Sequence, residues 1–206
     1  DVVLRNVAVG DVDHIRRAIT PRGLTFQGEG PTAAVRACTG AAVCAIGIAE
    51  APDVGRLLLS SSGLRRNSAL KVYVSGCPNS CAQHQAGDIG LAGSKVRIAG
   101  ATRIGYHLFL GADLGRGVVG EVVGRMAATD VPVVVDAVIG LWEAVRRDGE
   151  TLSATVHRIG HDGFAAHLEA VMADRWATGA EPTDDATPVT VAGPGGRAST
   201  AAPVVA

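Results

Sequence analysis

The sequence predicts an α/β (α+β) fold in which helices flank a mixed sheet, and three observations support this prediction. Short apolar stretches with alternating side chains, such as residues 71–74, are typical of strands with one buried face. Longer stretches such as residues 131–147 repeat apolar side chains at helical intervals. Glycine-rich turns separate these stretches. With 206 residues, of which 47% are hydrophobic, the chain can bury one good core or two small ones.

The N-terminal region predicts a helix over residues 11–19. Apolar residues recur there at helical spacing, Asp11 is a candidate N-cap, and Pro21 ends the pattern. A short strand is expected at residues 24–26, followed by a loop.

Residues 32–50 are rich in small side chains and contain the first two cysteines. An apolar helix is expected over residues 45–59, with an interruption around Pro52, because proline in a helix interior removes a hydrogen bond. Residues 60–68 are polar and predict a loop.

A strand is expected at residues 71–74, followed by three strands of one sheet at residues 89–91, 96–98 and 106–110. The first of them ends in the turn-forming sequence Gly76-Cys77-Pro78-Asn79-Ser80-Cys81. Pro78 fixes φ and Asn79 tolerates unusual dihedrals, so we expect two thiols on one compact bend.

Helical patterns return at residues 131–147 and 151–172. From about residue 177 the composition changes to Ala, Gly, Pro, Thr and Asp, which is typical of a disordered tail.

Charge and hydropathy exclude several classes of function. The net charge of −1 gives no global attraction to nucleic acid or to an anionic membrane. No apolar run approaches the roughly 20 residues of a membrane span, and no signal-peptide pattern is present, so a cytoplasmic protein is expected. The sequence begins at Asp1 and not at methionine, as a processed product or a piece of a longer chain would.

The four cysteines form two close pairs with the pattern Cys-x5-Cys-x32-Cys-x3-Cys, and they are the strongest candidate site residues: Cys38, Cys44, Cys77 and Cys81. Four cysteines are few for a disulfide scaffold of this length. Structural zinc sites usually separate paired ligands by two to four residues, and a spacing of five lies outside that range. Four ordinary buried cysteines are the remaining alternative.

Two other patterns carry less weight. His84 follows the second cysteine pair and could bind a metal or donate a proton, although a lone histidine is more often structural. Residues 115–120 match the Gly-x-Gly-x-x-Gly dinucleotide fingerprint after an expected strand, with Asp136 about 20 residues on, but such matches are expected by chance in a chain with 27 glycines. Three further histidines read better as solvated or capping groups than as ligands: His157, His161 and His167.

The cysteine motifs resemble a known family. Residues 38–44 together with residues 76–83 are similar to the sirohaem and iron–sulfur signature of assimilatory nitrite and sulfite reductases, and residues 88–93 and 106–111 are similar to that family too. The resemblance covers about residues 1–172 and corresponds to the C-terminal half of the family's chain. It implies a nitrite/sulfite reductase C-terminal-half-like fold. Residues 1–31 would end a ferredoxin-like half-domain, residues 32–176 would form the sirohaem/[4Fe–4S]-binding domain, and residues 177–206 the tail.

The resemblance also implies roles for the residues. Cys38, Cys44, Cys77 and Cys81 would ligate a [4Fe–4S] cluster, and Cys81 would also bridge to the sirohaem iron. A ferredoxin or a reductase would supply electrons for the six-electron reduction of nitrite to ammonia or of sulfite to sulfide. Backbone amides after Gly76 and Gly111 are candidates for hydrogen bonds to cluster sulfides or to sirohaem carboxylates.

The family's anion-binding cations come from its N-terminal half, so a complementary half or subunit is expected. Lys71, Arg97 and Arg103 lie near the motifs but match no catalytic position, and the catalytic residues are left unassigned. Details of the motif are closer to nitrite than to sulfite reductases. The alternatives are a precorrin-3B synthase-like oxygenase of cobalamin biosynthesis and a non-catalytic iron–sulfur electron-transfer module.

Overall fold

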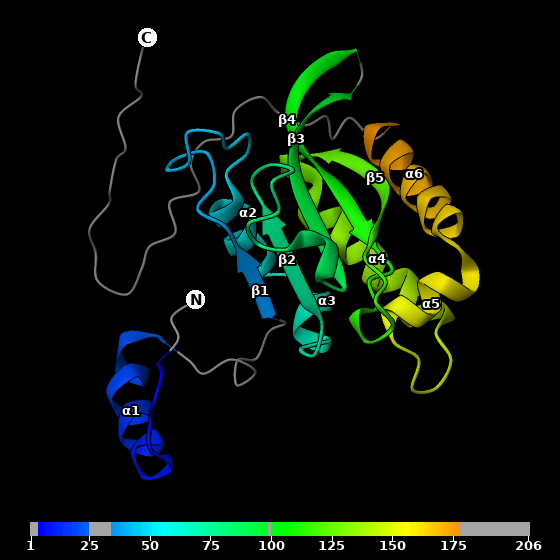
Figure 1. The fold of residues 1–206 in the computed structure, drawn as a ribbon. Coiled ribbons are helices and arrows are strands. Elements are labelled where there is room, and N and C mark those ends of the chain that lie inside the picture. Colours follow the sequence, from blue (N-terminus) through cyan, green and yellow to red (C-terminus); the bar gives the residue numbers. More distant parts are fainter. Residues whose placement is uncertain (1–3, 25–33, 99, 178–206) are drawn as a thin grey trace.

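A computed structural model describes residues 4–24, 34–98 and 100–177, and it confirms the predicted mixed sheet flanked by helices (Figure 1). Five strands follow one another across the sheet in the order of the chain. They are β1 (Ala34–Ala37), β2 (Lys71–Ser75), β3 (Ile89–Ile98), β4 (Ala101–Leu110) and β5 (Glu121–Ala127).

The strand pairing of the sheet changes from parallel to antiparallel at β3. β1, β2 and β3 are parallel, whereas β3, β4 and β5 are antiparallel. Because β1 and β2 are neighbours that run in the same direction, their carboxyl ends lie at the same edge of the sheet. Ligand sites of parallel sheets form at such edges. The sequence places one cysteine pair directly after each of these two strands.

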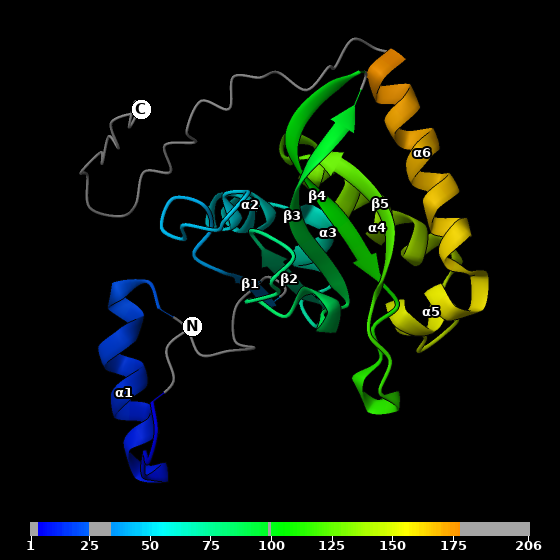
Figure 2. The ribbon, with the colours of Figure 1, turned by 45° about the horizontal axis from the view of Figure 1, so that its top comes forward.

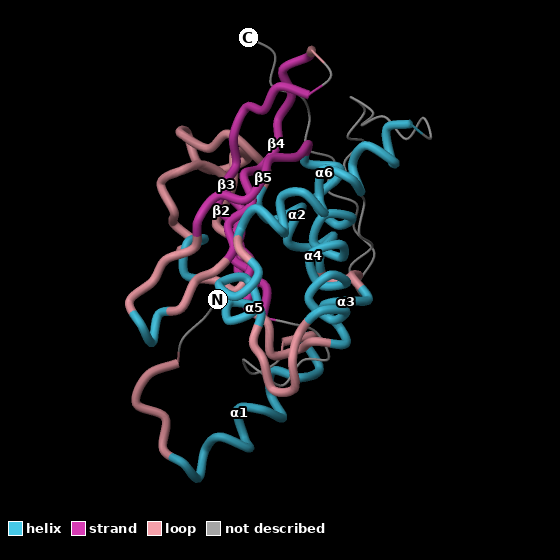
Figure 3. Tube along the Cα trace, turned by 90° about the vertical axis from the view of Figure 1, so that its right-hand side faces the viewer, coloured by secondary structure: helices cyan, strands magenta, loops and turns pink. Residues whose placement is uncertain are grey.

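Helices cover one face of the sheet, and Figure 3 shows this layer from the side. They are α2 (Ala51–Leu58), α3 (Ser62–Arg66), α4 (Val131–Val145), α5 (Leu152–Ile159) and α6 (His161–Ala177). The main core lies between the two layers and joins Leu58 and Ile139 from the helices to Val74, Leu91 and Leu108 from the strands. Short 3-10 turns stand at Val9–Asp11, Thr20–Arg22, His84–Ala86, Leu114–Arg116 and Ala128–Asp130.

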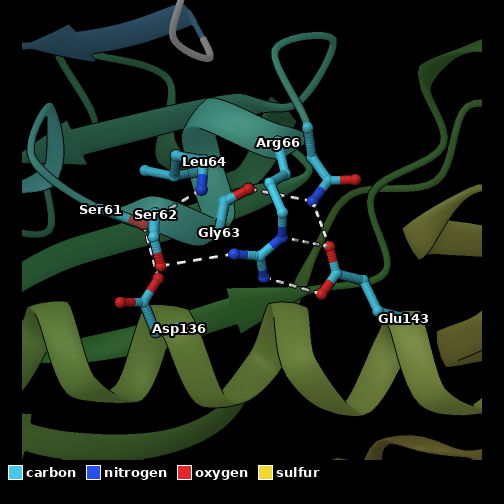
Figure 4. A network of polar contacts seen from close by, with 8 residues as sticks. Ser61, Ser62, Gly63, Leu64, Arg66, Asp136 and Glu143 are labelled. Carbon is cyan, nitrogen blue, oxygen red and sulfur yellow. Dashed lines mark hydrogen bonds and ion pairs between the residues drawn. The ribbon is translucent and has the colours of Figure 1, made fainter.

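The helix expected over residues 45–59 is shorter than predicted. Residues 45–50 form no helix, and Pro52 stands in the first turn of α2, where its missing N–H costs no intrahelical bond. The predicted loop at residues 60–68 contains α3, which Ser61 caps by accepting a hydrogen bond from the backbone N–H of Leu64. Ser61 also donates to Asp136 of α4, so α3 is held against α4 by polar contacts (Figure 4).

The strands expected at residues 89–91 and 96–98 are parts of the single ten-residue strand β3. Its partner β4 is equally long, whereas β2 pairs with β3 only as far as Ala92. The β3–β4 hairpin therefore continues beyond β2 as a two-stranded ribbon, visible in Figure 2. A β1 strand and a β5 strand are also present, which the sequence did not predict.

The expected helix over residues 131–147 is confirmed as α4, but the stretch at residues 151–172 is two helices that meet at Gly160, whose φ is 86°. The dinucleotide interpretation of residues 115–120 is wrong, because this segment leads into strand β5 and not into a helix. Asp136, which would have contacted the ribose, instead accepts a hydrogen bond from Ser61.

The predicted N-terminal helix is confirmed as α1 (Val12–Ile19), and none of its residues is buried. The expected strand at residues 24–26 falls largely outside the described residues, as does the boundary expected near residue 31. The expected tail also lies outside them, apart from residue 177 at the end of α6. Within the described part of the chain no helix is long and apolar enough to cross a membrane.

Candidate metal centre

The two cysteine loops leave the sheet side by side. The backbone N–H of Cys38, directly after β1, donates to the carbonyl oxygen of Val74 in β2 at 3.0 Å, which extends the pairing of the strands into the first loop. Cys77 and Cys81 follow the end of β2 at the same edge. The parallel pairing of β1 and β2 therefore brings together two cysteine pairs that are far apart in the sequence.

All four cysteines line one pocket. Its volume is about 320 Å³, part of which is open to solvent, and its lining consists of Cys38, Thr39, Gly40, Cys44, Ile46, Gly47, Ser75, Gly76, Cys77, Asn79 and Cys81. None of the four thiols is in a disulfide. Cys77 is buried, Cys38 and Cys44 are half-buried, and Cys81 is exposed. The four free cysteines of the pocket therefore differ in their exposure to solvent.

The first loop is folded by tight backbone turns. Gly40 has a φ of +68°, and its carbonyl oxygen accepts a hydrogen bond from the N–H of Cys44 at 2.9 Å. A Cβ at Gly40 would stand 2.8 Å from the backbone nitrogen of Ala51, so only glycine permits this approach to the start of α2. The turn after Cys38 therefore sets the position of Cys44.

The second loop is bonded directly to the first. The N–H groups of Ile48 and Ala49 both donate to the carbonyl oxygen of Gly76 at 2.9 Å. The N–H of Gly76 donates to the sulfur of Cys38 at 3.0 Å. A backbone amide that donates to a cysteine sulfur is a typical neighbour of a metal-bound thiolate.

The backbone around Cys81 is unusual. Ser80 and Gln83 both have a φ of 59°, a left-handed conformation that few residues other than glycine adopt. The N–H of Ala82 donates to the hydroxyl of Ser75 at 3.2 Å, which ties this bend to the end of β2. Strained residues of this kind persist where the surrounding structure holds them, and here they flank the exposed Cys81.

Strand β3 provides the support under the second loop. A Cβ at Gly93 would stand 2.3 Å from the carbonyl oxygen of Gly76, and a Cβ at Gly90 would stand 1.9 Å from that of His84. The carboxylate of Asp88 accepts a hydrogen bond from the backbone N–H of Lys71 at 2.8 Å. The motif at residues 88–93, part of the family resemblance, is therefore a structural support for the cysteine loop.

His84 is buried, with 1% of its surface exposed, and burial lowers its pKa. Its ring packs against Phe109 with a centroid distance of 4.6 Å. These contacts agree with the structural role that the sequence favoured. Next to it, Gln83 accepts a hydrogen bond from Arg36, whose guanidinium lies 4.5 Å from the ring centroid of Tyr73.

The other candidate residues lie away from the pocket. Lys71 is at the opposite end of β2 from Cys77, and Arg97 and Arg103 are on the β3–β4 ribbon. Gly111 directly follows β4, at the end of that strand that pairs with the start of β3. A Cβ at Gly111 would stand 2.7 Å from Nε2 of the His161 ring. The amides after Gly76 and Gly111 therefore lie at opposite ends of the sheet.

The candidate histidines of the C-terminal helices also stand apart from the cysteines. His157 and His161 contact each other with ring centroids 6.2 Å apart, and His161 Nε2 lies 3.3 Å from the carbonyl oxygen of Leu110. His167 lies farther along α6. These positions agree with structural and solvated roles.

The donor set fits a polynuclear cluster. Among residues 4–24, 34–98 and 100–177, no three Cys, His, Asp or Glu side chains gather closely enough for a single metal ion. All four cysteines instead line one pocket, and a [4Fe–4S] cluster takes one thiolate for each iron.

Comparison with known proteins identifies related chains. A family model described as the nitrite and sulphite reductase 4Fe-4S domain matches residues 31–175. The chain is 37% identical over 81 residues to a ferredoxin–nitrite reductase of Leptolyngbya laminosa. The aligned segment covers 38% of this chain and 16% of that protein. It is 28% identical over 169 residues to the sulfite reductase [NADPH] hemoprotein beta-component of Methylobacterium sp. (strain 4-46). This alignment covers 78% of this chain and 27% of that protein.

Solved structures show the same fold. The Mycobacterium tuberculosis NirA protein superposes with a TM-score of 0.63 and 22% identity over 77% of this chain and 31% of that one. Dissimilatory sulfite reductase I (DsrI) superposes with a TM-score of 0.61 and 12% identity. This superposition covers 79% of this chain and 58% of that chain. The chain spans less than a third of the length of the two curated relatives described above.

Proposed function

The chain belongs to the nitrite and sulphite reductase family through a 4Fe-4S domain over residues 31–175, and on this premise we propose that it is the cluster- and sirohaem-binding part of an assimilatory nitrite or sulfite reductase. Its relatives are oxidoreductases of both substrate types. They lend support to neither a precorrin-3B synthase nor an electron-transfer module. The observation that carries the proposal is the convergence of four free thiols on one pocket.

In this proposal Cys38, Cys44, Cys77 and Cys81 bind the [4Fe–4S] cluster as thiolates. The chain supplies rigid positions for them, because the two loops share hydrogen bonds through Gly76. Amides that point at sulfur stabilise negative charge, and the Gly76 N–H does this at Cys38.

Cys81 is the proposed shared ligand of the cluster and the sirohaem iron. Of the four cysteines it is the exposed one, so a macrocycle outside the pocket could reach its sulfur. The left-handed residues Ser80 and Gln83 stand on either side of it in the chain. When bound, the cluster supplies electron storage and the sirohaem supplies a reducible iron.

The proposal also requires a partner. The described lining of the pocket contains neither lysine nor arginine, whereas an anionic substrate and a carboxylate-rich macrocycle need fixed positive charge. We propose that a complementary N-terminal half supplies it, with residues 32–176 as the binding domain and residues 1–31 as the end of the preceding half-domain. Nitrite or sulfite would be the substrate. A ferredoxin or a reductase would be the electron donor, since relatives are named for ferredoxin and for NADPH.

Anaerobic purification of the chain tests the cluster. We expect about four iron and four acid-labile sulfide per chain, with a visible absorbance that dithionite bleaches. Zinc in place of iron, or iron without sulfide, would refute the cluster assignment.

Addition of sirohaem to the cluster-loaded chain, together with a family N-terminal half, tests the second cofactor. The expected result is a haem spectrum that depends on both components, with nitrite or sulfite consumed when reduced methyl viologen is the donor. A loaded cluster without sirohaem binding under these conditions would rule out the reductase and leave only cluster binding.

A further inference from the structure

A row of side chains crosses the sheet beside the second cysteine loop. It consists of paired residues on four neighbouring strands: Ser75 of β2, Ala92 of β3, His107 of β4 and Arg125 of β5. Directly paired residues have their side chains on the same face of a sheet. The four residues therefore belong to one face, and we call them the cross-strand row.

The cross-strand row faces away from the helix layer that Figure 3 shows. His107 stands between Tyr106 and Leu108, which both belong to the main core under the helices. Because successive side chains of a strand point to opposite faces, His107 and the rest of the row point to the other side of the sheet. The members of the row on β2 and β3 are buried, His107 is half-buried and Arg125 is exposed.

The row begins at the bend that carries Cys81. The hydroxyl of Ser75 accepts a hydrogen bond from the backbone N–H of Ala82, the residue after Cys81, at 3.2 Å. Neighbouring strands are about 4.8 Å apart, so His107 lies about 10 Å and Arg125 about 14 Å from Ser75 along the row. A tetrapyrrole whose iron is bound by Cys81 is large enough to reach both side chains with its peripheral carboxylates.

The charge of this face favours an anionic ligand. Glu121 is the one acidic residue of the five strands. It pairs with Leu110 of the main core, and its carboxylate lies 4.0 Å from His161 of α6, so it belongs to the helix side. The strands also contain six basic residues: Arg36, Lys71, Lys95, Arg97, Arg103 and Arg125. The strand residues on the face of the row therefore include no carboxylate.

Core packing does not explain the two polar members of the row. Within the described part of the chain, neither His107 nor Arg125 has a hydrogen bond or an ion pair. A charged side chain on an edge strand such as β5 can prevent pairing with another chain, which is a sufficient reason for Arg125 alone. β4 lies between β3 and β5, so that reason does not apply to His107. A ligand that contacts both residues accounts for the pair.

We propose that His107 and Arg125 bind peripheral carboxylates of the sirohaem and so fix its orientation beside Cys81. This inference rests on the proposed cofactor function. A guanidinium offers a carboxylate two parallel N–H donors, and an imidazole offers one. This chain then contributes cofactor-binding residues of its own, in addition to the positive charge expected from the complementary half.

Sirohaem titration tests this binding. The cluster-loaded full chain is mixed with a family N-terminal half, and sirohaem binding is followed by absorbance. Arg125→Gln should raise the dissociation constant about tenfold, because a charge-assisted hydrogen bond is lost, and Arg125→Lys should raise it less. His107→Phe should also raise it. Iron and sulfide content should stay at the wild-type level in these variants, since neither residue lines the cysteine pocket.

Arg97→Gln is the matched control. Arg97 is an exposed arginine of β3, and its odd spacing from Ala92 places it on the opposite face from the row. Its substitution makes the same change in net charge and should leave the dissociation constant within about twofold of the wild type. Equal losses in Arg97→Gln and Arg125→Gln would overturn the inference, because net charge alone would then explain them.

Metal-free sirohydrochlorin separates carboxylate binding from iron ligation. It carries the same carboxylates but forms no bond to the Cys81 sulfur, so Arg125→Gln should weaken its binding by the same factor. An unchanged affinity of Arg125→Gln for both tetrapyrroles would overturn the inference while the cofactor assignment stood.

Association of the chain with the N-terminal half is measured without sirohaem by analytical ultracentrifugation, and Arg125→Gln should leave it unchanged. Weaker association would show that this face binds the complementary half, and it would overturn the inference. A wild-type chain that holds its cluster but binds no sirohaem would overturn both the inference and the proposed function.

Discussion

The carbonyl oxygen of Gly76 lies 2.3 Å from the point at which a Cβ of Gly93 would stand. This contact joins the start of the second cysteine loop to the middle of β3. Three residues earlier, Gly90 leaves room for the carbonyl oxygen of His84, which follows the same loop. The two glycines therefore support the loop that carries Cys77 and Cys81 from both of its ends.

Gly93→Ala should move this loop. A Cβ at 2.3 Å from a backbone oxygen forces the backbone to shift, and we expect a loss of about 1–3 kcal/mol in the free energy of unfolding. Displacement of Gly76 would also break its contacts with Ala49 and Cys38, so iron content should fall. Denaturant unfolding and iron analysis measure the two effects.

Gly124→Ala is the control for this substitution. Gly124 is also a strand residue, and a Cβ there would meet no atom within 4 Å. Its effect should stay within about 0.5 kcal/mol. Equal losses at positions 93 and 124 would show that the close approach to Gly76 does not matter.

The sequence predicted much of the sheet layer because β2, β3 and β4 are apolar and bounded by turn residues. It missed β1, whose four residues are too short for a pattern, and β5, whose exposed Val122 and Arg125 break the alternation. Pairing with neighbouring strands decides such segments, and a single sequence does not display pairing.

The four cysteines could be selected as a candidate set from their pairing in the sequence and from the family resemblance, but the residues that position them could not. Gly90 and Gly93 look like ordinary turn formers in the sequence, yet both lie inside a strand where another backbone approaches closely. His107 and Arg125 also look ordinary in the sequence, and only the strand register places them in one row with Ser75. Both features depend on contacts between residues that are distant in the chain.

Cys81→Ser should remove the proposed cluster without unfolding the chain. Cys81 is exposed, so its sulfur contributes little to the core, and we expect a change within about 0.5 kcal/mol in the cluster-free chain. Loss of one of four thiolates should lower iron and sulfide content and alter the visible spectrum. Thr102→Ala, an exposed change on the β3–β4 ribbon, is the control and should keep the full cluster. An unaltered spectrum in Cys81→Ser would contradict its role as a ligand.

Glu150 predicts a dependence of stability on acid pH. Hydrogen bonds from the Arg158 guanidinium, and one from the backbone N–H of Arg147, lower the pKa of Glu150 from 4.5 to about 2. Between these values the unfolded chain binds more protons than the folded one, so this stabilisation is full above about pH 5 and is lost as the pH falls toward 2.

Glu150→Gln should therefore lower stability at pH 7 and flatten the decline between pH 5 and 2, as followed by denaturant unfolding at each pH. Glu169→Gln, which changes an exposed carboxylate on α6, is the control. The acid decline of Glu169→Gln should resemble that of the wild type. A wild-type decline that persists unchanged in Glu150→Gln would contradict the assignment.

Ser61→Ala tests the contact between α3 and α4 (Figure 4). The Ser61 hydroxyl accepts from the N–H of Leu64 at 3.0 Å and donates to the carboxylate of Asp136 at 2.5 Å. Alanine removes the helix cap and leaves a half-buried carboxylate without this donor, so we expect a loss of about 2–3 kcal/mol in the free energy of unfolding. Thermal or denaturant unfolding measures it.

Ser62→Ala is an adjacent control for this contact. The Ser62 hydroxyl accepts only a 3.4 Å hydrogen bond from exposed Arg66, and its loss should cost less than about 0.5 kcal/mol. In a double-mutant cycle, Ser61→Ala and Asp136→Ala should be coupled, because each removes the same bond. Iron content should not change in these variants, since the α3–α4 contact contributes no residue to the cysteine pocket. Additive effects at positions 61 and 136 would show that the bond between them does not hold α3 in place.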